Sequence, residues 1–136
     1  MRTLMLTIAA VIGLSGAVSA QNKLMLEVSG LSPKRGELYI AVFDSQDNFM
    51  KKMATGVIIE VKGTTAIAEF DLAAGNYAIT MFQDENLNGE LDLGQYGIPQ
   101  EKYGFSNNAK PIMGPPSFET CSFEVKGGTV QKIQMQ

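Results

Sequence analysis

Apolar side chains recur at every second position in several short stretches of this chain, which is the period of a β-strand with one buried face. In the stretch 24–29, for example, Leu24, Leu26 and Val28 alternate with the residues between them. This alternation and the turn residues around it predict seven strands, at 24–29, 38–43, 57–61, 66–70, 77–81, 118–125 and 129–135. No stretch has a convincing helical period. We therefore expect an all-β fold, a seven-stranded antiparallel β-sandwich of immunoglobulin-like or transthyretin-like type.

The first 20 residues have the features of a secretory signal peptide. Arg2 precedes an apolar stretch at 4–14, and the small residues at 17–20 form a cleavage region that ends at Ala20. A permanent membrane anchor is the alternative, but the apolar stretch is shorter than the roughly 20 residues that cross a bilayer. We expect cleavage near Ala20. The product is then one β-sandwich domain at 21–136, periplasmic or secreted and without a membrane span.

The composition excludes several kinds of site. The chain has no histidine and one cysteine, Cys121. It therefore cannot form a Ser-His-Asp or Cys-His catalytic set, a histidine metal site, an internal disulfide or a multi-thiolate zinc site. Removing Arg2 from the 11 Lys+Arg leaves 10 against 14 Asp+Glu, a net charge of −4. An acidic chain without clustered cations argues against nucleic acid as a partner.

One long connection interrupts the predicted strands. It runs over 83–116, and loops beyond about 12 to 15 residues in compact domains are usually functional or disordered. The connection holds four of the five prolines together with Tyr96, Tyr103 and Phe105. Because disordered segments are usually poor in aromatic residues, we expect an ordered loop that wraps over the sandwich with its aromatic side chains packed down.

The beginning of this connection has the ligand spacing of a calcium-binding loop. Asp84, Asn86, Asn88 and Asp92 occupy relative positions 1, 3, 5 and 9 of an EF-hand-type loop, and Gly89 occupies the turn position 6. Calcium prefers six to eight oxygen ligands at about 2.3 to 2.6 Å, and alternate residues of a coiling backbone can direct their oxygens inward. The pattern therefore predicts a Ca²⁺ site in the loop 84–95.

The rest of the expected ligand set departs from that pattern. Glu90 would contribute its backbone carbonyl, but Gln95 stands at position 12, where a bidentate glutamate is usual. We expect Glu101 or Glu119 to supply the missing carboxylate from farther along the chain. With so few carboxylates the affinity should be modest, on the order of 10⁻⁴ to 10⁻³ M.

A plain β-hairpin is the alternative interpretation of the same residues. Asn88 and Gly89 are the preferred pair for a two-residue type I′ turn, and the leucines around them could belong to its strands. The acidic residues would then be ordinary solvated surface.

Three segments resemble a known family. They are LAAGNYAI at 72–79, DENLNGELD at 84–92 and GIPQEKYGFSNN at 97–108. Together they resemble the uncharacterised exported bacterial family called domain of unknown function 2141 (DUF2141), over essentially the whole chain after the leader. The resemblance implies a secreted β-sandwich and no particular activity. The first segment is also similar to transthyretin-like and carboxypeptidase-regulatory-like domains, which are mostly accessory modules.

Two classes of function follow. The first is an exported, non-enzymatic module whose calcium-ordered loop presents a surface to an envelope protein, a peptide or a glycan. The second is a glycosidase-like hydrolase that uses a carboxylate pair, for instance Asp84 or Asp92 with Glu101. We favour the first, because a domain of this size offers little cleft for a polymer. Cys121 shares a predicted strand face with Phe123 and Val125, which predicts a buried and inert thiol.

Overall fold

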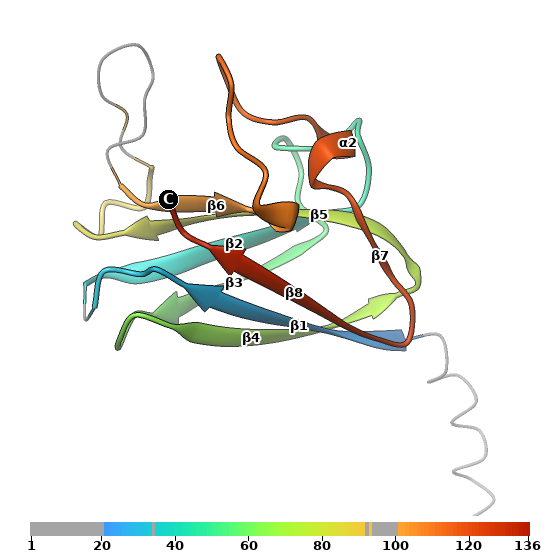
Figure 1. Ribbon diagram of the computed structural model, residues 1–136, viewed down its shortest axis with the longest axis horizontal. Helices are drawn as coiled ribbons and strands as arrows, with labels where there is room; N and C mark the ends of the chain where they lie inside the picture. The colour runs from blue at the N-terminus through green and yellow to red at the C-terminus, as the bar shows by residue number, and fades with distance from the viewer. Residues whose placement is uncertain (1–20, 34, 92, 94–100) are drawn as a thin grey trace, which may run out of the picture.

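The computed structural model describes residues 21–33, 35–91, 93 and 101–136. In this part of the chain, two β-sheets lie face to face (Figure 1). The three-stranded sheet has the order β4-β1-β8, from Ala66–Ala73, Gln21–Ser29 and Gly128–Gln134. The other sheet has the order β3-β2-β5-β6, from Thr55–Glu60, Glu37–Phe43, Gly75–Asp84 and Tyr103–Phe105. β7 (Phe123–Val125) also pairs with β5. The prediction of an all-β sandwich is confirmed.

The strand count and one strand direction differ from the prediction. The described residues form eight strands rather than seven, because β6 lies inside the segment that was expected to be a loop. β1 pairs with β4 in the antiparallel direction but with β8 in the parallel direction. Alternation of apolar residues identifies a strand and its buried face, but it carries no information about the direction of the neighbouring strand.

The predicted strand at 118–125 is a short helix followed by a strand. The helix α2 covers Phe118–Cys121, and β7 begins at Phe123. The side chain of Ser117 accepts a hydrogen bond from the backbone N–H of Thr120. This local cap satisfies a backbone donor without a neighbouring strand, and it therefore favours a helical turn over strand pairing.

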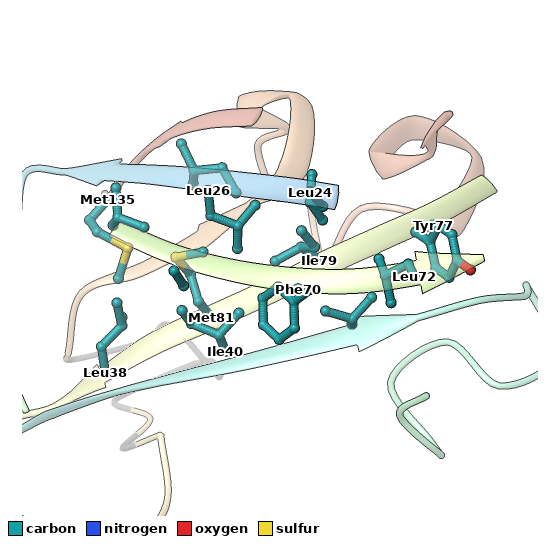
Figure 2. Close-up of a cluster of buried hydrophobic side chains, with 14 of the residues drawn as sticks. Leu24, Leu26, Leu38, Ile40, Phe70, Leu72, Tyr77, Ile79, Met81 and Met135 are labelled. Carbon is teal, nitrogen blue, oxygen red and sulfur yellow. The ribbon is translucent and has the colours of Figure 1, made fainter. Parts of the chain in front are cut away.

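The main core lies between the two sheets, as Figure 2 shows for a part of it. Leu24 and Leu26 of β1 face Ile79 and Met81 of β5, and all four are buried. The alternation that predicted the strands thus corresponds to the buried positions. Burial of this apolar surface is the main favourable contribution to folding.

A second, smaller cluster lies on the other face of β5, because Ala78 points away from the main core. It is formed by Ala78, Phe105, Ala109 and Cys121, with Phe49, Tyr103 and Phe118 packed against them. The cluster therefore holds the 3-10 turn η3 (Ser106–Asn108), α2 and the turn that contains Phe49 on the outer face of the five-stranded sheet. The described helices include none that is both long enough and apolar enough to cross a membrane.

Candidate functional site

The candidate loop begins at the end of β5, where two polar side chains are fully buried. Gln83 and Asp84 are both 0% exposed. Gln83 Oε1 accepts the backbone N–H of Ser32 over 2.8 Å, and its Nε2 donates to the carbonyl oxygens of Ser32 and Arg35 over 2.8 and 2.7 Å. Three hydrogen bonds thus tie the base of the loop to the segment between β1 and β2.

A close backbone approach fixes the same end of β5. Gly36 has a φ of +68°, and a Cβ atom placed on it would overlap the carbonyl oxygen of Asp84. The next residue, Glu37, is the β-sheet partner of Asp84. Glycine is therefore required at this position both by backbone conformation and by space.

The carboxylate of Asp84 organises the loop that follows it. Its Oδ1 accepts the backbone N–H of Asn88 over 3.1 Å, and its Oδ2 accepts the backbone N–H of Gly89 over 2.6 Å. Hydrogen bonds to an ionised acceptor are shorter and stronger than neutral ones. The chain therefore coils around the residue at relative position 1 of the predicted calcium loop.

The two asparagines make further turns in this coil. Asn86 Oδ1 accepts the N–H of Asn88 over 3.2 Å, and Asn88 Oδ1 accepts the N–H of Glu90 over 3.0 Å. These contacts are Asx turns, in which a side-chain oxygen caps the backbone two residues later. Positive φ angles occur at Leu87 (57°) and Gly89 (79°). The loop thus has the alternating side-chain direction and the glycine turn that the sequence predicted.

The alternative type I′ hairpin is not formed by these residues. A type I′ turn requires positive φ at both central residues, but among the residues with positive φ are Leu87 and Gly89 and not Asn88. Residues 85–91 are turn, bend or irregular rather than strand.

Glu85 is a residue that the sequence analysis did not single out. Its Oε2 accepts from Ser32 Oγ over 3.2 Å, and its Oε1 lies 3.5 Å from Arg35 Nη2. Its backbone N–H donates to Glu101 Oε2 over 2.9 Å. In an alternating loop Glu85 faces away from the predicted ligands, and no local pattern could have revealed partners 50 residues earlier.

The other predicted ligands have different positions. Glu101 is 9% exposed and lies at the start of the loop through its bond to Glu85. Glu119, the other candidate for the final carboxylate, is on α2. Glu90 is exposed, and Asp92 lies outside the described residues.

The charge around Asp84 is negative. No lysine or arginine of the described residues forms an ion pair with Asp84, although its side chain is fully buried. Near it, the pKa of Tyr39 is raised, first by loss of hydration and then by the negative charges of Glu37 and Asp84. Tyr39 also stacks on Phe82, with 4.9 Å between ring centroids.

The donor set suits a hard cation only in part. The described oxygens are the carboxylates of Asp84 and Glu101, the side-chain amides of Asn86 and Asn88, and the carbonyl of Glu90, which are ligand types that Ca²⁺ accepts. Apart from the undescribed Asp92, no three Asp, Glu, Cys or His side chains come together closely enough to hold a metal ion. A calcium site here would therefore depend on amide and carbonyl oxygens.

The same geometry bears on the carboxylate-pair hydrolase. The carboxylates of Asp84 and Glu101 both accept backbone N–H groups, and neither side chain is exposed. A general acid in glycoside hydrolysis must reach the glycosidic oxygen of its substrate. In this arrangement the two side chains are structural acceptors.

Comparison with known proteins identifies one family. The family described as uncharacterized protein conserved in bacteria (DUF2141) matches residues 26–134. No curated protein matches the chain, and no solved structure does.

Proposed function

This chain belongs to the DUF2141 family of bacterial proteins, and from that premise and the loop geometry we propose that it is an exported, non-enzymatic β-sandwich module with a structural calcium-binding loop at 84–95. The leader at 1–20 is removed near Ala20, and the mature chain works in the periplasm or outside the cell. The calcium loop orders the connection after β5, which then presents a surface to an envelope protein, a peptide or a glycan.

One observation carries the calcium proposal, namely the fully buried carboxylate of Asp84 with the loop coiled around it. A buried carboxylate without a paired cation is unfavourable unless hydrogen bonds or a bound ion compensate the lost hydration. Two backbone N–H groups provide part of that compensation. A carboxylate has about four lone-pair sites, and the remaining ones are available to an ion.

Each proposed ligand has a defined part. Asp84 and Glu101 would supply charge, Asn86 and Asn88 would supply amide oxygens, and Glu90 would supply its carbonyl. Asp92 would bind directly or through water. Bound calcium would supply positive charge that joins the two ends of the 84–101 segment.

Calcium titration by calorimetry, after thorough chelation, tests the proposal. We expect heat of binding with a Kd on the order of 10⁻⁴ to 10⁻³ M and a higher melting temperature in saturating Ca²⁺, because a ligand of the folded state stabilises it. Asp84→Asn should remove both effects. This variant keeps one side-chain oxygen as an acceptor, so its folding is verified separately in chelator.

Asp47→Asn is the matched control, because Asp47 is exposed and lies outside the loop. It should leave the titration unchanged. Absence of binding heat in the wild-type protein, or an equal response of the Asp84→Asn variant, would refute the calcium loop. Mass spectrometry of the exported protein tests the leader, for which the expected N-terminus is Gln21.

A further inference from the structure

Two large apolar side chains stand at the tip of the connection between η3 and α2. Ile112 is 82% exposed and Met113 is fully exposed. In Figure 1 this connection, coloured orange, rises above the outer face of the five-stranded sheet. Single exposed apolar side chains are common on protein surfaces, but adjacent ones at a protruding tip often indicate an interaction site.

The tip is held in shape by its own sequence. Pro111, Pro115 and Pro116 restrict the backbone on both sides of it. Met113 has a φ of 57° and Gly114 a φ of 137°. At its base, Ala109 is buried in the second cluster and Ser117 caps α2. The apolar side chains are therefore displayed by a preorganised turn.

A second turn on the same side carries similar residues. Met50 and Met53 are 50% and 56% exposed. Between β2 and β3, Phe49 packs edge-on against Phe118 of α2, with 5.8 Å between ring centroids. This contact and Figure 1 place the two segments on the same side of the sheet.

Positive charge accompanies the apolar side chains. The stretches 48–54 and 109–117 contain three lysines, Lys51, Lys52 and Lys110, and no acidic residue. All three are exposed. The whole chain has a net charge of −3, so this is a locally basic surface on an acidic protein. The neighbouring acids at positions 44, 47 and 119 limit the size of the basic patch.

We propose that these two turns, 48–54 and 109–117, form a docking surface for an anionic lipid bilayer. Protruding apolar tips can enter the headgroup region, where their burial from water favours binding. Adjacent lysines add attraction to anionic lipids, and their long side chains can keep the charge at the surface. A protein partner would instead need a groove that fits two separate projections. This proposal names a partner for the exported protein, and so it rests on the export in the proposed function but not on calcium.

Flotation with lipid vesicles tests the proposal, using the protein recovered after export and kept in chelator. We expect binding to phosphatidylcholine vesicles that contain phosphatidylglycerol, weaker binding without it, and loss of binding at high salt. Substitution of Ile112→Ser together with Met113→Ser should weaken binding at least about tenfold. Lys51→Gln and Lys52→Gln should each weaken it about fivefold.

The matched control removes two exposed apolar side chains from the outer face of the other sheet, Ile67→Ser with Val130→Ser, which are 64% and 54% exposed in the wild-type protein. This variant should bind as the wild type does. No binding to anionic vesicles, or an equal loss in the control, would overturn the proposal. Asp84→Asn should leave vesicle binding intact, so failure of the calcium loop and failure of the lipid surface give different results.

Discussion

The α-carbon of Gly36 lies so close to Asp84 that a Cβ atom on the glycine would overlap the aspartate's carbonyl oxygen and approach its carbonyl carbon to 2.8 Å. This contact brings the start of β2 against the end of β5, where the calcium-type loop begins. The loop is thus anchored by backbone contact as well as by the side chain of Gln83.

Replacing Gly36 with alanine should therefore destabilise the protein by about 2 to 4 kcal/mol, because alanine is strained at positive φ and has no space here. Chemical denaturation followed by circular dichroism measures this loss. Gly63→Ala is the control, since a Cβ there meets no atom within 4 Å, and it should change stability by less than about 1 kcal/mol. Equal stability of the two variants would contradict the close approach.

Gln83→Met should lower stability by about 1 to 3 kcal/mol, because methionine keeps the side-chain length but leaves backbone groups of Ser32 and Arg35 without their partner. The same variant should speed hydrogen exchange of the Ser32 amide, which NMR detects. Gln46→Met, at an exposed position, should have little effect on either measurement. An unchanged Ser32 exchange rate would show that the clasp does not hold in solution.

The Tyr39 hydroxyl reports on charge at Asp84. Because Asp84 contributes to the raised pKa of Tyr39, Asp84→Asn should lower that pKa toward its ordinary value. Saturating Ca²⁺ should do the same in the wild-type protein if the ion binds beside Asp84. NMR of ring-labelled tyrosine follows the titration. Tyr77, whose raised pKa comes from desolvation and from Asp44, is an internal control that should not move.

Cys121 should make the protein less stable in alkaline solution. Burial raises the pKa of its thiol from 9.0 to about 11. The unfolded chain therefore ionises first, so this contribution to stability is complete below pH 9 and is lost as the pH rises toward about 11. The total loss is on the order of 1 to 3 kcal/mol.

Denaturation curves across this pH range should therefore be less steeply pH-dependent for Cys121→Ala than for the wild type, since the other titrating groups are common to both. In native protein at neutral pH the thiol should react with a disulfide reagent only slowly, and denaturant should release it. Rapid reaction of the native protein would contradict the burial of this side chain.

The strands and the coil of the loop could be predicted because both depend on neighbouring residues. Leu24 and Ile79 were assigned to buried faces from their alternation, and both are buried. Asp84 and Gly89 were placed at the beginning and the turn of a coiled loop, and they are hydrogen-bonded across it. α2 was missed because the Ser117 cap competes with the strand-like pattern around it.

By itself, the sequence determined which residues turn inward and where the chain coils, because side-chain direction and local turns follow from the backbone geometry of adjacent residues. Only the tertiary structure decided that β8 runs parallel to β1, that Gln83 holds the segment before β2, and that Glu101 joins the start of the loop. These contacts join residues far apart in the chain. They form only when packing of the whole sandwich offsets the entropy lost in bringing the segments together, and no local pattern contains that information.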